Sequence, residues 1–127
     1  MINYSKQTID FKEISAVSKV LRSNYLTQGP LVEKFEKKIS SYCKSKYAVA
    51  VNSATSGLHI ACLSLGVKKN DIVWTSAISF VASANAAAYC GAQIEFLDIS
   101  LNDYNLDIIS LKKKLLEAKK KTRFQKL

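Results

Sequence analysis

At 127 residues the chain has the length of one small domain, and an apolar content of 48% is typical of a globular protein rather than a disordered one. The formal net charge of +9 would suit a nucleic-acid-binding protein, but residues 112–126 alone carry a net +7, against +2 for residues 1–111. Because the excess charge belongs to one end of the chain, the composition argues against a basic face that recognises nucleic acid.

The three cysteines argue against a disulfide-bonded secreted protein and against a metal-binding one. Cys43, Cys62 and Cys90 are widely spaced and form no CxxC or Cys/His pattern, so we expect buried free thiols in a reducing compartment and no bound metal. The N-terminus has no charged and then apolar leader, and no apolar run has the length of a membrane span. The sequence therefore predicts a cytoplasmic protein without a membrane partner.

The first 46 residues are predicted to be an extended arm followed by two helices. Residues 1–8 form the arm, Asp10 caps a helix that ends near Arg22, and Pro30 begins the second helix, where its missing N–H costs nothing. The loop between them contains Thr27, Gln28 and Gly29. Apolar residues at helical spacing predict a buried stripe on the second helix, formed by Val32, Phe35, Ile39 and Tyr42.

The rest of the chain alternates strands with helices. The strands are predicted at 47–52, 71–74 and 93–98, and the helices at 55–65, at 79–90 and from near Asp107. This alternation indicates an α/β fold with a mainly parallel sheet. The small residues of 80–92 predict a helix that packs closely against its neighbours.

A cluster of small hydroxylated residues follows the first predicted strand. It reads Asn-Ser-Ala-Thr-Ser-Gly over residues 52–57 and opens a helix, an arrangement that can hold a phosphate on backbone N–H groups and hydroxyls. Neither a Gly-Lys-Ser/Thr nor a GxGxxG motif is present, which favours a single small phosphate over a nucleotide. The alternative is a well-capped core helix, because Ser and Thr are ordinary N-caps.

A second polar cluster, Thr75–Phe80, follows the next predicted strand. Because ligands of open α/β sheets bind beyond the carboxyl ends of the strands, we expect both clusters to converge on one site.

Three segments in order carry a resemblance to a known family: Leu26–Glu36, Asn52–His59 and Trp74–Asn85. Together they resemble the N-terminal third of the DegT/StrS family of sugar-nucleotide aminotransferases, which use pyridoxal 5'-phosphate (PLP). The resemblance implies an incomplete PLP-dependent transferase fold type I large domain, a three-layer αβα architecture. In the branch most resembled, L-glutamate donates an amino group to C4 of a UDP-4-keto-6-deoxy-N-acetylhexosamine in the pseudaminic acid pathway.

The resemblance also assigns residues. Thr55 and Ser56 match the position that binds the PLP phosphate, Ser53 is a weaker candidate whose alternative is a turn residue, and Phe80 matches the ring stacked on the pyridine. Phe80 could equally be a plain core residue. The substrate-side positions of the family are matched by Tyr4, Thr27, Gln28 and Gly29.

Four other conspicuous residues are predicted to be structural. His59, the only histidine, is interpreted as packed within its helix, and Trp74 as a strand core residue. Asp98 is interpreted as a turn at a strand end and Asp107 as a helix cap. Ala77 stands where the family commonly has proline, which loosens that loop.

The lysine that forms the Schiff base and the carboxylate at the pyridine nitrogen lie, in the family, beyond the length of this chain. We therefore expect no catalytic residue and no activity in this chain alone, and a homodimer for the complete enzyme. Residues 1–121 are predicted to belong to the large domain and 122–127 to a basic tail that looks truncated or frameshifted. Alternative functions are a small basic module that binds nucleic acid, a family member acting on another keto-sugar nucleotide, and a family dehydratase.

Overall fold

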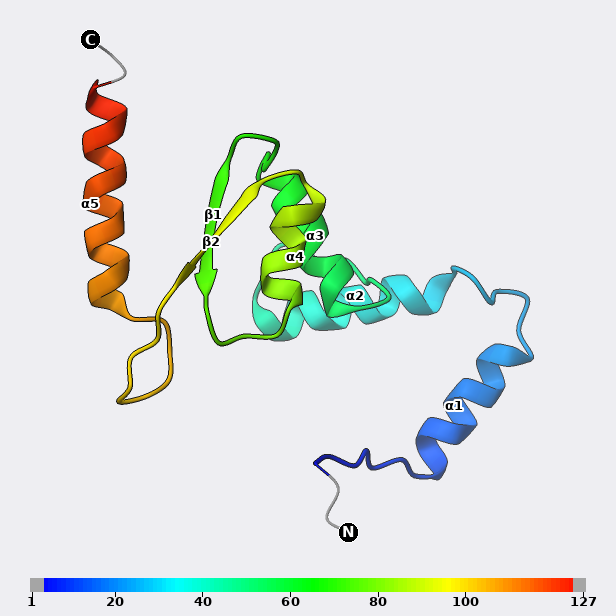
Figure 1. Ribbon diagram of the computed structural model, residues 1–127. Helices are drawn as coiled ribbons and strands as arrows, with labels where there is room; N and C mark the ends of the chain where they lie inside the picture. The colour runs from blue at the N-terminus through cyan, green and yellow to red at the C-terminus, as the bar shows by residue number, and fades with distance from the viewer. Residues whose placement is uncertain (1–3, 125–127) are drawn as a thin grey trace. The chain divides into compact units, whose positions relative to one another are not determined.

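The computed structural model describes residues 4–124, and the side chains of residues 4–120 (Figure 1). The chain divides into two compact units, residues 1–50 and residues 51–127. The predicted tail at 122–127 lies partly outside the described residues, and the predicted division at residue 121 stays a prediction.

The first unit holds two helices that begin where the sequence predicts. In α1 (Phe11–Leu21), the Lys12 N–H donates to Asp10 Oδ1 at 2.6 Å, and the Asp10 N–H donates to Glu13 Oε2 at 2.9 Å. The side chain of Asp10 also accepts the Glu13 N–H, so Asp10 and Glu13 form a capping box. The Lys12 N–H, and then Glu13, hold the pKa of the Asp10 carboxyl below its usual value. Helix α2 (Pro30–Cys43) has proline in its first turn, as predicted.

The prediction of a buried stripe on α2 is wrong. Phe35 is 56% exposed and Tyr42 is 88% exposed, while Val32 and Ile39 are each about 40% exposed. An amphipathic face is buried only when another element covers it. Within the described part of this unit, neither helix makes an extensive contact with another element.

The second unit contains α3 (Ala54–Ser64), β1 (Ile72–Ser76), α4 (Ala82–Tyr89), β2 (Gln93–Leu97) and α5 (Ile108–Phe124). The two strands pair in parallel, with Ile72 opposite Gln93 and Ser76 opposite Leu97. Helix α4 packs on α3 and on both strands. The small residues Ala82, Ala86, Ala87 and Ala92 are buried, as the sequence predicts, and Leu97 of β2 completes the core.

The strand predicted at 47–52 does not form. Residues 47–51 have neither helix nor strand structure, and the Ala50 N–H donates to Glu36 Oε1 at 2.8 Å instead of to a neighbouring strand. Val49 is 75% exposed. A run of apolar residues becomes a strand only where a second strand pairs with it, and the sheet of the described residues has two strands rather than the predicted three.

Helices lie on both faces of the two strands. The side chains of Thr75 and Phe96 point to the face covered by α4, and those of Trp74 and Glu95 point to the opposite face, because neighbouring residues of a strand alternate. Lys114 of α5 reaches Glu95 on this second face. Figure 1 shows α4 and α5 on opposite sides of the strands. A parallel sheet packed against helices agrees with the predicted α/β fold, although α5 approaches its face of the sheet through few contacts.

Asp107 caps α5, as predicted. Its carboxylate accepts hydrogen bonds from the Ser110 hydroxyl at 2.6 Å and from the N–H groups of Ser110 and Ile109. The Ser110 hydroxyl and then these backbone donors hold the pKa of Asp107 below its usual value.

We expect the first turn of α5 to loosen in acid. A depressed carboxyl pKa contributes stability above the unfolded pKa of about 4, and this stability is lost as the pH falls through the lower folded pKa. Cα chemical shifts of residues 108–112, followed by NMR from neutral to acidic pH, measure the change. Asp107→Asn keeps a capping oxygen but does not titrate. An identical acid transition in the Asn variant would contradict the assignment.

Candidate functional site

The N-terminus of α3 is built by Ser53. Its backbone is extended, and its Oγ accepts the Ser56 N–H at 3.2 Å and lies 3.1 Å from Ser56 Oγ. The Gly57 N–H donates to the Ser53 carbonyl at 3.1 Å. Ser53 is therefore a helix cap rather than a simple turn residue. The cluster begins a well-capped helix, which was one of the two interpretations of the sequence.

Capping leaves two donors for a ligand. Among the described residues, the N–H groups of Ala54 and Thr55 have no hydrogen-bond acceptor. The first N–H groups of a helix lack an acceptor within the helix, so they stay free unless a side chain or a ligand binds them. The side chains of Thr55 and Ser56 are half-buried. Two free donors, nearby hydroxyls and the positive end of an 11-residue helix fit a phosphate dianion.

A second hydroxyl-rich feature lies at the end of β1. It is a hollow of about 220 Å³ lined by side chains of β1, the following loop, α4 and Phe96, and the Phe80 ring at its edge is 75% exposed. Ser79 Oγ and Ser83 Oγ lie 2.8 Å apart. Phe80 is therefore no core residue in the described chain, and its exposed face is available for stacking.

The hollow beside Phe80 contains neither Ser53, Thr55 nor Ser56. The predicted convergence of the two polar clusters on one site therefore stays a prediction. The Ser79–Ser83 pair was not predicted from the sequence, because Ser79 lies in the loop before α4 and the contact depends on how that loop folds.

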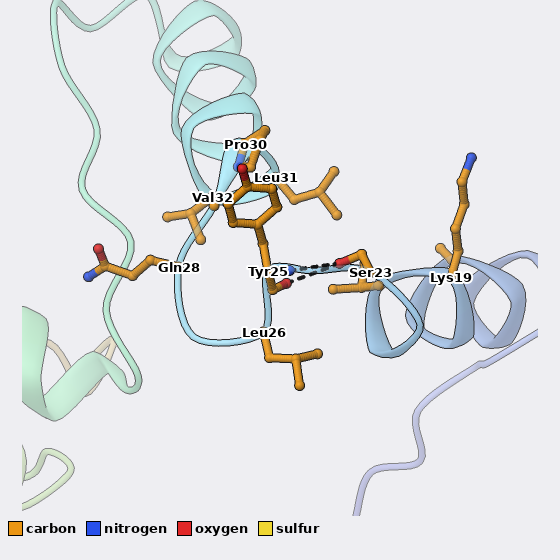
Figure 2. A pocket seen from close by; sticks show the side chains of 11 residues that line it. Lys19, Ser23, Tyr25, Leu26, Gln28, Pro30, Leu31 and Val32 are labelled. Carbon is orange, nitrogen blue, oxygen red and sulfur yellow. Dashed lines mark hydrogen bonds between the residues drawn. The ribbon is translucent and has the colours of Figure 1, made fainter.

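The substrate-side residues lie in the first unit. Gln28 and Gly29 line an apolar hollow of about 410 Å³ between the end of α1 and the start of α2, where Tyr25 and Leu26 form much of the wall (Figure 2). Thr27 is not part of the lining, and Tyr4 is fully exposed on the N-terminal arm.

Gly29 is required by close packing. A Cβ atom placed on it would lie 2.7 Å from Tyr25 Cβ, closer than any side chain permits. The Tyr25 backbone is fixed in turn by Ser23, whose Oγ accepts the Tyr25 N–H and donates to the Tyr25 carbonyl, each at 3.2 Å (Figure 2). The contact between Tyr25 and Gly29 was not visible in the sequence, because it depends on how the loop folds back.

The single histidine is packed, as predicted. The His59 ring is half-buried and meets the Tyr89 ring edge to face, with centroids 5.3 Å apart and an interplanar angle of 65°. This contact joins α3 to α4. Asp98 lies directly after β2, at the strand end as predicted, and its Oδ1 accepts the Ile99 N–H at 2.8 Å, but the turn itself lies later, at residues 101–103.

Trp74 has a polar partner that the sequence did not reveal. Its side chain is half-buried in β1, and its indole N–H donates to Glu95 Oε2 at 3.1 Å.

The cysteines are free, but the prediction that all three are buried is wrong. Cys43 is exposed at the end of α2, while Cys62 in α3 and Cys90 at the C-terminal end of α4 are half-buried. Burial and the nearby Cys62 raise the pKa of the Cys90 thiol. The described residues contain no cluster of His, Cys, Asp or Glu suited to a metal, and none of their helices is both long and apolar enough to cross a membrane.

Comparison with known proteins gives consistent matches along most of the chain. The model of the DegT/DnrJ/EryC1/StrS aminotransferase family matches residues 7–122. The UDP-4-amino-4,6-dideoxy-N-acetyl-beta-L-altrosamine transaminase of Campylobacter jejuni is 44% identical over 117 residues, which cover 92% of this chain and 31% of that protein. The chain thus spans about a third of the length of the relatives it matches.

Two solved structures illustrate the likeness of the fold. Spr1654 of Streptococcus pneumoniae, a sugar aminotransferase by its description, was solved in a PLP form. It matches with a TM-score of 0.85 and 30% identity, over 88% of this chain and 29% of that one. The GDP-4-keto-6-deoxy-D-mannose-3-dehydratase of E. coli, solved with bound hydrated PLP, has a TM-score of 0.81 and 32% identity. That match covers 89% of this chain and 31% of the dehydratase.

Proposed function

Because the chain belongs to the DegT/DnrJ/EryC1/StrS aminotransferase family, we propose that it forms the N-terminal third of a PLP-dependent sugar-nucleotide aminotransferase. The proposed reaction transfers an amino group from L-glutamate to C4 of a UDP-4-keto-6-deoxy-N-acetylhexosamine, as in pseudaminic acid synthesis. The observation that carries this choice of substrate is the 44% identity to the C. jejuni transaminase. The complete enzyme is proposed to be a cytoplasmic homodimer.

The contribution of this chain is proposed to be part of the cofactor site. The free N–H groups at the start of α3, with the hydroxyls of Ser53, Thr55 and Ser56, would hold the PLP phosphate. Phe80, exposed beside a hydroxyl-lined hollow, would cover one face of the pyridine. Bound PLP supplies an electron sink for the transfer.

The substrate side is proposed to involve Tyr4, Thr27, Gln28 and Gly29. The hollow beside Gln28 and Gly29 is apolar, with an amide and a backbone kept accessible by glycine at its edge. These features suit a ligand that presents both ring surfaces and hydroxyl groups.

A hybrid enzyme tests the proposal. It joins residues 1–121 of this chain to the remaining part of the C. jejuni transaminase, and it is given PLP, ¹⁵N-labelled L-glutamate and the UDP-4-keto sugar. We expect 2-oxoglutarate and a sugar nucleotide that carries ¹⁵N, seen by mass spectrometry. A hybrid that folds and binds PLP but places no ¹⁵N on the sugar nucleotide would count against the proposal.

The basic C-terminal end permits a nucleic-acid-binding alternative, for which we expect a negative result. Lysines 112, 113, 119 and 120 are exposed on α5, so weak binding without sequence preference should appear at low salt and fall steeply as salt rises. Fluorescence anisotropy with two unrelated RNA sequences measures this. Removing residues 112–127 should abolish binding. Sequence-selective binding by the shortened chain would favour the alternative.

A further inference from the structure

The inward face of α5 is centred on a charged residue. Of the residues of α5 up to 120, the half-buried ones are Ser110, Leu111, Lys114 and Ala118, which recur at helical spacing. Lysine is rarely found in such a stripe unless it is paired. The Lys114 side chain is 27% exposed, whereas the neighbouring Lys112 and Lys113 are exposed to solvent.

Lys114 meets two side chains of the sheet at once. Its Nζ lies 2.5 Å from Glu95 Oε2 and 5.6 Å from the centroid of the Trp74 ring. The same Glu95 oxygen accepts the indole N–H of Trp74 at 3.1 Å. Trp74 and Glu95 are direct register partners on β1 and β2, so the three groups form a closed triangle that spans both strands and the helix.

Most of the large apolar side chains of α5 are exposed, with Leu111 half-buried as the exception. Ile108, Ile109 and Leu116 are each more than half exposed, and Leu115 is 43% exposed. In proteins most of the stability of a helix comes from the packing of one of its faces. The position and the persistence of α5 therefore depend on the polar triangle more than on hydrophobic burial.

We propose that Lys114, Glu95 and Trp74 form an electrostatic latch that holds α5 on this face of the sheet, and that α5 releases as a unit while α3, β1, α4 and β2 stay folded. The cation lies over the ring and beside the carboxylate, so it is stabilised by both. Because Glu95 is 42% exposed, salt screens the pair, and ionic strength sets the fraction of docked α5. Release would uncover Trp74.

Hydrogen exchange of the 127-residue chain tests the latch, with the amides of α4 as internal reference. We expect Lys114→Met to lower the protection of α5 amides roughly fivefold, the loss typical of one such pair and cation–π contact, and to leave α4 unchanged. Lys113→Met, one residue away and exposed, should match the parent. Glu95→Gln should lower the protection of α5 at least as much as Lys114→Met does.

The dependence of α5 protection on salt concentration separates an electrostatic attachment from apolar packing, which salt of this kind does not screen. About 1 M NaCl should loosen α5 in the parent as the Lys114→Met change does, should loosen it much less in that variant, and should increase acrylamide quenching of Trp74, the only tryptophan. Equal protection of α5 in the Lys114→Met and Lys113→Met variants would overturn the proposal. Simultaneous loss of protection in α4 would also overturn it, because α5 would then not be separable.

Discussion

Incubated with PLP, L-glutamate and the UDP-4-keto sugar, the 127-residue chain alone is expected to form no 2-oxoglutarate beyond that produced by free PLP. Transamination needs an amine that bonds to the cofactor and a carboxylate beside its pyridine nitrogen. The hollow beside Phe80 is lined by hydroxyl, apolar and aromatic groups, without an ionisable side chain. General acid–base chemistry at that position therefore has no group to perform it.

The measurement is a coupled assay for 2-oxoglutarate, with the hybrid enzyme as positive control and free PLP as background. Turnover by the 127-residue chain close to that of the hybrid would contradict the account. It would mean that a lysine of this chain takes the role assigned to the remaining part of the enzyme.

The same chain in isolation is expected to associate or to bind hydrophobic dyes. The apolar stripe of α2 is exposed, and both outer edges of the two-stranded sheet are open within the described residues. Parallel strands are normally covered on both faces and flanked by neighbours, and open edges pair readily with other chains. Exposed apolar faces of this kind are typical of surfaces that another element or another chain covers.

Sedimentation velocity across a concentration series, with dye fluorescence in parallel, measures this. Charged substitutions on the α2 stripe, such as Phe35→Glu, should reduce association without unfolding α2, whereas Glu33→Gln on the solvent side should not. A monomer with a sharp cooperative melt and no dye binding would show that the unit is self-sufficient.

Local chemistry explains which parts of the fold could be predicted. The starts of α1, α2 and α5 follow from Asp10, Pro30 and Asp107, whose capping or ring geometry acts within one helical turn. The prediction of a strand at 47–52 is wrong because a strand forms only with a partner strand that is distant in sequence. The prediction that the apolar stripe of α2 is buried is wrong for the same reason. The spacing of apolar residues predicts that they share one face of the helix, but not which element covers that face.

The candidate site was predictable in composition rather than in three-dimensional detail. The Ser-Ala-Thr-Ser sequence implied a helix start with hydroxyls, and Ser53 and Ser56 interact as such a start requires. The packing of Tyr25 against Gly29 and the link from Trp74 to Lys114 are tertiary contacts without a sequence pattern. They join residues whose separation along the chain carries no periodic signal.

The central claim, that the start of α3 holds the phosphate of PLP, is tested most directly by absorbance titration of PLP into the hybrid enzyme and its variants. Thr55→Val should weaken binding by roughly 1.5–3 kcal/mol, about one to two decades in affinity, because a charge-assisted bond to the phosphate is lost. Phe80→Ala should weaken it less, through lost stacking area. His59→Ala, which removes the contact with Tyr89, should lower thermal stability and leave PLP affinity close to that of the parent. Parental PLP affinity for Thr55→Val together with weakened affinity for His59→Ala would contradict the assignment of the phosphate site.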